Sequence, residues 1–143
     1  MKTEIWKDVL GYEGLYKVSN LGRVKRIWRE KERILKLRDN GTGYYRVELC
    51  ENGKRKGLSV HRLVVEAFLY KIPNGSVVNH INEIKTDNRL ENLEICTIKE
   101  NNSHGTRTTR AATSRRGKFH SEEAKRKMSE AQKVNWQRRR KED

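Results

Sequence analysis

The sequence predicts an α+β fold with a small antiparallel N-terminal sheet, a central strand–loop–strand–helix unit and an extended basic C-terminal arm that ends in a helix. Three observations support this prediction. Up to Gly105, short segments rich in β-branched and aromatic residues are separated by turn formers, as in an antiparallel meander. One segment in this region changes to helical periodicity. After Gly105 the chain carries thirteen basic and five acidic residues and shows no core pattern.

Two hairpin patterns predict the N-terminal sheet. Asn20 and Gly22 can supply the turn of the first hairpin, and Asn52-Gly53 is a strong turn signal for the second. The predicted strands are Tyr16–Ser19, 23–27, 44–50 and 55–60. The aromatic residues expected in the core of this sheet are Trp6, Tyr12 and Tyr16, because they lie among periodic apolar positions.

The central unit begins with apolar residues at helical spacing, which predict a short buried helix over Val60–Phe68. Two strands, Ser76–His80 and Leu93–Thr97, are expected to pair in antiparallel fashion across a long polar loop. Thr97 is a candidate N-cap for a helix that begins at Ile98, with Glu100 in the capping-box position. The expected order is therefore strand, loop, strand, helix.

The C-terminal arm starts with small, hydroxyl and basic residues, which alone in water should be disordered or extended. Ser121 is expected to cap a helix that runs to about Lys141, with Glu122 and Glu123 in its first turn. The apolar stripe of this helix is thin, so we expect a partner to hold it.

Composition limits the function classes. The 143 residues carry a net charge of +14, which favours a polyanionic partner. With only Cys50 and Cys96, a zinc cluster of the CxxC type is not possible, and a reducing cytoplasm is the simpler setting. We expect a soluble protein that is not exported and does not bind membranes, because no uncharged run of transmembrane length occurs and no helix has one large apolar face.

Amide side chains gather around one histidine in the central unit. Asn79 and His80 are adjacent at the end of the first strand, and Asn101 lies on the following helix, so all three are expected to meet at one point. A neutral imidazole can deprotonate a water molecule, and amide oxygens can bind a hard divalent cation. Phosphodiester hydrolysis uses this combination. The other histidines have other expected roles: His61 as a core or capping residue, His120 as a local cap or phosphate contact, and His104, as a minority option, near the metal or the phosphate.

Several motifs in this order resemble the HNH homing endonucleases of phages and mobile introns. They are "HRLVVEAF", "VVNHIN", "KTDNRLENL" and "KENN". The stretch "EIWKDVLGYEGLYKVSNLGRVKRI" resembles a modular motif that often precedes this nuclease unit, and "GKFHSEEAKRKMSEAQK" resembles a DNA-binding helix motif found after it. The resemblance implies an N-terminal sheet module over 1–55, a ββα-metal HNH nuclease unit over 56–105 and an extended DNA-binding arm and helix over 106–143.

The resemblance also implies residue roles. His80 would be the general base, Asn92 the middle asparagine that ties the hairpin loop together, and Asn79 and Asn101 the ligands of Mg²⁺ or Mn²⁺. The position of Asn79 can be an aspartate in this family, and an amide binds Mg²⁺ more weakly than a carboxylate does. The family pattern gives Asp87 no metal role. From the residues alone, Asn88 and Asn92 are expected to satisfy loop backbone groups.

The basic arm is expected to bind double-stranded DNA, although charged helices are often only solvated. The candidate DNA-binding residues are Arg107, Arg110, Arg115, Arg116, Lys118, Lys125, Arg126 and Lys133. The leading hypothesis is a metal-dependent, site-specific homing endonuclease that cuts or nicks DNA as a monomer in the cytoplasm of a bacterial or phage-infected cell. The alternatives are a catalytically weak or inactive DNA-binding protein on the same scaffold and a basic RNA-binding protein.

Overall fold

The computed structural model describes residues 3–106, 109–110, 112–113 and 121–141. The chain divides into two compact units, one up to Gly105 and one from Thr106 onward, and each is described by itself. Within the described residues, no helix is both long and apolar enough to cross a membrane. The predicted α+β class is confirmed.

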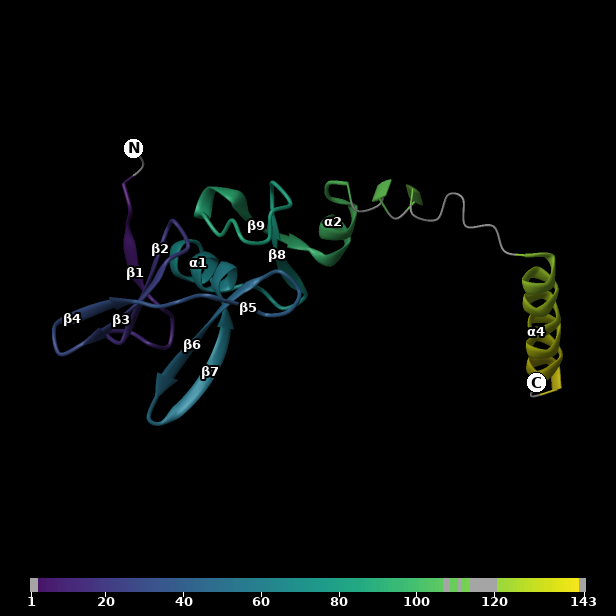
Figure 1. Ribbon diagram of the computed structural model, residues 1–143, viewed down its shortest axis with the longest axis horizontal. Coiled ribbons are helices and arrows are strands. Elements are labelled where there is room, and N and C mark those ends of the chain that lie inside the picture. The colour runs from purple at the N-terminus through teal and green to yellow at the C-terminus, as the bar shows by residue number, and fades with distance from the viewer. Residues whose placement is uncertain (1–2, 107–108, 111, 114–120, 142–143) are drawn as a thin grey trace. The chain divides into compact units, whose positions relative to one another are not determined.

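An antiparallel sheet of four strands opens the first unit (Figure 1). Its strands are β1 (Trp6–Asp8), β2 (Tyr16–Ser19), β3 (Val24–Trp28) and β4 (Lys31–Ile34), in that spatial order. The prediction of β2 is confirmed, and β3 begins one residue later than predicted. The sequence did not indicate β1 or β4, because β1 is short and every residue of β4 is exposed, so neither has the alternation of a half-buried strand.

A second antiparallel sheet consists of β5 (Arg38–Asp39), β6 (Tyr45–Glu51) and β7 (Lys54–Ser59). Asn52 and Gly53 form the β6–β7 turn with φ values of 50° and 75°, as the Asn-Gly signal predicted. The β6–β7 hairpin extends away from α1 (Figure 1).

The central unit has the predicted elements. Helix α1 (Val60–Phe68) is followed by β8 (Ser76–His80), which pairs with β9 (Leu93–Thr97). A short 3₁₀ helix (Leu90–Asn92) ends the intervening loop. Helix α2 (Ile98–Ser103) then packs against both strands. The expected strand–loop–strand–helix order is confirmed, including the capping box between Thr97 and Glu100.

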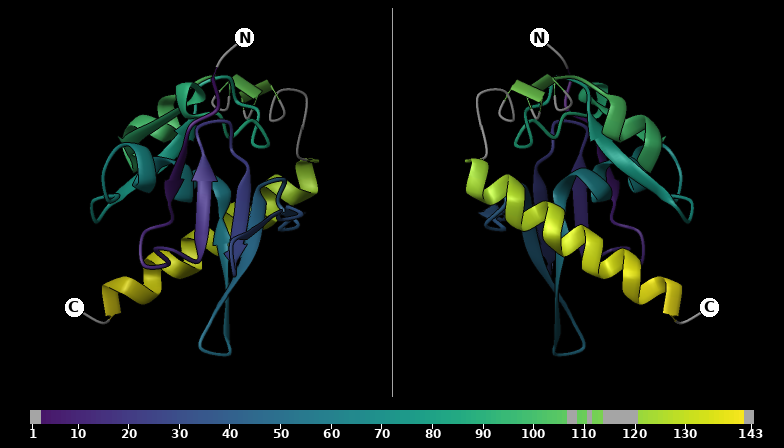
Figure 2. Two further views of the ribbon diagram at one scale, coloured as in Figure 1. Left: turned by 90° about the vertical axis from the view of Figure 1, so that its left-hand side faces the viewer. Right: turned by 90° about the vertical axis from the view of Figure 1, so that its right-hand side faces the viewer.

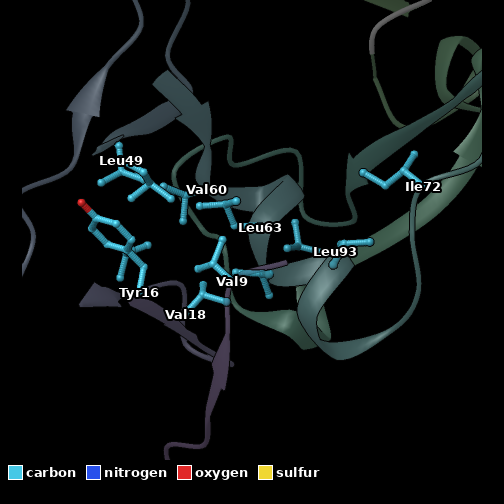
Figure 3. Close-up of a cluster of buried hydrophobic side chains, with 12 residues drawn as sticks. Val9, Tyr16, Val18, Leu49, Val60, Leu63, Ile72 and Leu93 are labelled. Atoms are coloured by element: carbon cyan, nitrogen blue, oxygen red, sulfur yellow. The ribbon is translucent and has the colours of Figure 1, made fainter. Parts of the chain in front are cut away.

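One core joins these elements (Figure 3). Helix α1 buries one face, including Val60, Leu63 and Val64, and contacts strands of all three sheets formed by the described residues. The Tyr16 hydroxyl also links the first two sheets, because it donates to the Cys50 carbonyl oxygen at 3.2 Å and accepts from the Cys50 N–H at 3.0 Å. A shared core explains why the chain up to Gly105 is one compact unit.

The aromatic core prediction is correct for Tyr16 and wrong for Trp6. Tyr16 is buried, and Tyr12 packs partly buried against the core. Trp6 is only half-buried and lies outside the core, with the Lys25 ammonium 4.4 Å from the centre of its ring. The attraction between the ammonium and the ring face stabilises Trp6 at the edge strand without burial in the core.

The second unit contains α4 (Glu122–Lys141), which Figure 2 shows as one unbroken helix. The Ser121 hydroxyl oxygen accepts from the Ala124 N–H at 3.2 Å, so the predicted cap is confirmed. Residues 109–110 and 112–113 are helical, contrary to the expected extended conformation. The Thr113 hydroxyl donates to the Thr109 carbonyl oxygen at 2.9 Å, which satisfies a backbone group within a helical turn.

Candidate active site

His80 ends β8 and is buried, with 5% of its surface exposed. Its Nε2 atom lies 3.0 Å from the side-chain oxygen of Asn88. Because that oxygen can only accept a hydrogen bond, the contact requires the proton on Nε2 and leaves Nδ1 as the basic nitrogen. The ring also packs against Tyr44 and His61, with centroids 5.8 and 5.3 Å away. Packing and one hydrogen bond therefore fix the orientation of this imidazole.

The turn between β2 and β3 of the N-terminal sheet packs against Asn88. Asn88 is 3% exposed, and a Cβ atom placed on Gly22 would lie 2.8 Å from the Asn88 Cβ. The neighbouring Leu90 N–H donates to the Asn20 carbonyl oxygen at 2.9 Å. The turn between β2 and β3 therefore contacts the loop that orients His80. The sequence assigned Asn88 to loop backbone, and its contact with the imidazole was missed.

Asn92 holds the loop between β8 and β9. Its side-chain oxygen accepts from the Asn82 N–H at 3.0 Å, and its amide donates to the Asn82 side-chain oxygen at 2.9 Å and to the Asp87 carbonyl oxygen at 2.8 Å. The Ile81 N–H donates to the Asn92 carbonyl oxygen at 2.9 Å. Asn92 therefore contacts loop groups rather than the His80 ring.

Asp87 is held by other side chains. The guanidinium of Arg89 donates to its carboxylate at 2.8 and 2.7 Å, and the Asn82 amide donates at 2.8 Å. The hydrogen bonds from Arg89 are the main cause that lowers the pKa of Asp87 to about 2. Its oxygens are thus used to stabilise the loop.

Asn79 faces a different environment from His80, as successive residues of a strand do. It pairs across the hairpin with Glu94, and its amide donates to the Glu94 carboxylate at 2.7 Å. His104 lies beyond α2, and its Nδ1 atom is 4.0 Å from the same Glu94 oxygen. These three side chains line a groove of about 420 Å³, together with Ile95, Cys96, Glu100 and Ser103.

Asn101 lies on α2 and is half-buried. The helix packs against β8 and β9, which brings its backbone close to the hairpin. Among the described residues, those that line the groove include Asn79 but not Asn101. Neither Glu94 nor its pairing was considered from the sequence, although equal antiparallel strands over Ser76–His80 and Leu93–Thr97 imply that register.

His61 lies at the start of α1 and is half-buried next to His80. Burial lowers its pKa to about 4, and the charges of His80 and Arg62 act in the same direction. Within the described part of the chain, its Nδ1 atom has no hydrogen-bond partner. His61 therefore packs as a neutral ring against the candidate base.

Half of the predicted DNA-binding residues fall within the described part of the second unit. Arg110, Lys125, Arg126 and Lys133 are exposed. Lys125 pairs with Glu122 at 2.7 Å, and Arg126 lies 3.9 Å from Glu130. Four predicted residues, Arg107, Arg115, Arg116 and Lys118, lie outside the described residues, as does His120.

The donors present suit a hard divalent cation better than zinc. Across the described ranges, no group of three or more His, Cys, Asp or Glu side chains could hold a metal ion. Amide oxygens are outside that set, and the Asn79 carboxamide lines a groove together with the Glu94 carboxylate and the His104 imidazole. Oxygen-rich ligand sets of this kind suit Mg²⁺ or Mn²⁺.

Comparison with known proteins agrees with the order of the motifs. Residues 4–50 match the NUMOD4 motif, residues 59–103 match the HNH endonuclease family and residues 117–134 match the NUMOD3 motif. The DNA endonuclease I-HmuI of Bacillus phage SP01 is 42% identical over 67% of this chain and 54% of its own length. An uncharacterised HNH endonuclease of Acanthamoeba polyphaga mimivirus is 44% identical over 72% of this chain and 26% of its own length.

A solved structure agrees as well. The structure describing DNA binding and cleavage by the HNH homing endonuclease I-HmuI matches with a TM-score of 0.62 and 35% identity, over 91% of this chain and 65% of that one. This chain therefore spans about half the length of the I-HmuI sequence and about a quarter of the mimivirus protein. The chain therefore carries the NUMOD4, HNH endonuclease and NUMOD3 motifs in this order and is homologous to the HNH homing endonuclease I-HmuI.

Proposed function

We propose that this protein is a metal-dependent, site-specific endonuclease that hydrolyses a phosphodiester bond of duplex DNA. The observation that carries this proposal is the His80 imidazole, which is held by Asn88 through Nε2 so that Nδ1 is the basic nitrogen. It lies within the residues that match the HNH endonuclease family. A fixed imidazole with one basic nitrogen is what a general base for water requires.

In this mechanism His80 takes a proton from the attacking water at Nδ1. Asn88 keeps the ring in the tautomer that can accept this proton, and Tyr44 and His61 restrict its rotation. Asn92 holds the loop that carries Asn88. The resemblance to the family names Asn79 and Asn101 as cation ligands, and Asn79 presents its amide to a groove beside a carboxylate. A bound divalent cation would stabilise negative charge on the departing 3′ oxygen.

The second unit supplies the charge for DNA binding in this proposal. Exposed basic residues on α4, among them Lys125, Arg126 and Lys133, would neutralise phosphates, together with the basic residues that precede the helix. Binding should weaken steeply as salt rises, and each lost phosphate contact should lower the salt slope by about one. We place the protein in the cytoplasm of a bacterial or phage-infected cell, acting as a monomer.

Cleavage of supercoiled DNA tests the proposal. The wild-type protein should nick or linearise the plasmid with Mg²⁺ or Mn²⁺, whereas His80→Ala should reduce the rate by about 100-fold or more. A urea unfolding curve for each protein separates loss of the base from loss of the fold. Equal cleavage by the two folded proteins would remove the assignment of His80.

The neutral side chain of Asn79 favours a second candidate function, a DNA-binding protein that cleaves weakly or not at all. An amide is a weaker cation ligand than the aspartate that this position can hold in the family. Tight binding of duplex DNA with no cleavage in any divalent cation would support this alternative. Gain of cleavage by Asn79→Asp would then identify the missing charge as the cause. Competition with RNA at fixed salt tests whether DNA is the preferred polyanion.

A further inference from the structure

We infer that Glu94 and His104 join Asn79 as ligands of a divalent cation, and that Glu94 supplies the carboxylate that Asn79 lacks. This inference rests on the proposed function, because it names the ligand set of the same cation. The three side chains line one groove on the β8–β9 hairpin and α2. The resemblance to the family assigned no role to Glu94.

The first step concerns charge. Two neutral amides alone would leave the positive charge of a divalent cation uncompensated, whereas carboxylates are its preferred ligands. Glu94 is the residue directly opposite Asn79 in the hairpin register. A carboxylate on β9 can therefore replace one on β8, because cross-strand partners point to the same face.

The second step concerns the contact between these two side chains. The Asn79 amide nitrogen lies 2.7 Å from a Glu94 carboxylate oxygen. Rotation of the carboxamide about its last torsion exchanges its nitrogen and oxygen. Two oxygens at this separation are close to the spacing of about 3 Å between neighbouring ligands of a Mg²⁺ ion. A cation can thus take the place of the amide hydrogen bond with little movement of the backbone.

The third step concerns His104. Its Nε2 atom lies 3.1 Å from the Ile81 carbonyl oxygen, which can only accept, so Nε2 carries a proton and Nδ1 is the atom with a free lone pair. Nδ1 faces the Glu94 oxygen at 4.0 Å. Histidine ligands of metals commonly donate their other N–H to a backbone carbonyl in this way. The separation leaves room for an ion bound at roughly 2 Å from each atom.

The fourth step concerns three other acidic residues of the hairpin and its helix. Asp87 and Glu91 both pair with Arg89, and Glu100 belongs to the capping box of α2. Among the described residues, the contacts of the Glu94 carboxylate are instead with Asn79 and His104, both of which carry ligand atoms. Two carboxylates line the groove, those of Glu94 and Glu100. Because Glu100 is used in the capping box, Glu94 is the one that is placed to bind a cation there.

The chemistry of this set has a consequence for the choice of metal. An imidazole beside two oxygen ligands favours Mn²⁺ over Mg²⁺, whereas a site built from amide oxygens and water alone would favour neither strongly. We therefore expect the chain to bind Mn²⁺ at least about tenfold more tightly than Mg²⁺.

Cation binding, read without cleavage, tests the inference. Mn²⁺ is titrated into the 143-residue chain, with and without a short duplex, and binding is followed by calorimetry and by the electron paramagnetic resonance signal of free Mn²⁺. Glu94→Gln should lose Mn²⁺ affinity by more than about tenfold, since it removes the charge and keeps the shape. Glu91→Gln is the matched control, because both side chains are 45% exposed and Glu91 does not line the groove. It should change the affinity by less than about twofold.

A charge-swap variant keeps the test specific. Asn79→Asp combined with Glu94→Gln returns a carboxylate to the opposite strand and should recover most of the lost affinity. Wild-type affinity in Glu94→Gln, or no Mn²⁺ binding by the wild type with or without duplex, overturns the inference. Cleavage by the wild type together with unchanged binding in Glu94→Gln would reject only this ligand set. Loss of binding in Glu94→Gln without any cleavage by the wild type would reject only the nuclease proposal.

Discussion

Substitution of Gly22 by alanine should disturb the orientation of the candidate base, His80, through Asn88. Gly22 lies in the turn between β2 and β3, with a φ of +82°. A Cβ atom at this position would lie 2.8 Å from the Asn88 Cβ, 3.0 Å from its carbonyl oxygen and 3.1 Å from its carbonyl carbon. Asn88 in turn binds the His80 ring at 3.0 Å. The new methyl group therefore pushes on the residue that orients the imidazole.

The size of the effect follows from these distances. Carbon atoms pack at about 3.5 Å or more, so Asn88 or the turn must move by roughly 0.7 Å. A movement of this size can lengthen the bond to His80 beyond hydrogen-bonding distance. The left-handed backbone costs about 1–2 kcal/mol for an L-residue, and the broken buried hydrogen bond costs about 1–3 kcal/mol. We expect the free energy of unfolding to fall by about 2–5 kcal/mol. The rate of cleavage should fall by about 10- to 100-fold.

Gly75→Ala provides the control. Gly75 has a φ of +80°, but an added Cβ would meet nothing within 4 Å. This variant therefore reports the backbone cost alone, about 1–2 kcal/mol, with cleavage unchanged. Urea unfolding and plasmid nicking are measured on both variants. Equal losses of stability and cleavage in Gly22→Ala and Gly75→Ala would refute the proposed link through Asn88.

Three further substitutions test other parts of the structure. The pKa of His61 is lowered from 6.5 to about 4, so its contribution to stability is complete above pH 6.5 and is lost as the pH falls toward 4. His61→Phe should remove this loss of unfolding free energy, which is at most roughly 3 kcal/mol, when urea unfolding curves are measured between pH 6.5 and pH 4. Thr97→Ala removes the N-cap of α2, so it should lower the free energy of unfolding by about 1 kcal/mol in the same assay and speed hydrogen exchange in that helix. Unchanged exchange would contradict this. Tyr16→Phe should lower stability by about 1–3 kcal/mol in thermal unfolding, since it leaves the Cys50 backbone groups without the hydroxyl; an unchanged midpoint would show that water replaces it.

The elements of the central unit could be predicted closely from the sequence. Helix α1, strands β8 and β9 and the start of α2 have the predicted bounds, because each carries a local signal. Buried apolar residues at helical spacing, equal β-branched strands and a Thr-Glu capping box act over a few residues. Strand β4 and the short β5 carry no such signal, since their residues are exposed and their pairing comes from neighbouring strands.

The site was predicted only in part, and the reason is geometric. Adjacent residues of a strand point to opposite faces, and the side-chain partners of Asn79 and His80 in β8 accordingly differ. Neither partner was predicted from the sequence. His80 contacts Asn88, whereas Asn79 contacts Glu94. The assignment of Asn79, His80, Asn92 and Asn101 to cation binding and catalysis stays a prediction that the experiments above test.

The sequence by itself determined the three motifs, their order and the local conformation of the central unit, because those properties depend on residue types at short spacing. Only the tertiary structure decided which side chains meet. Glu94 faces Asn79 because of the hairpin register, and Gly22 supports Asn88 because a shared core packs the first sheet against the loop. Contacts between residues far apart in the chain depend on packing, which no local pattern specifies.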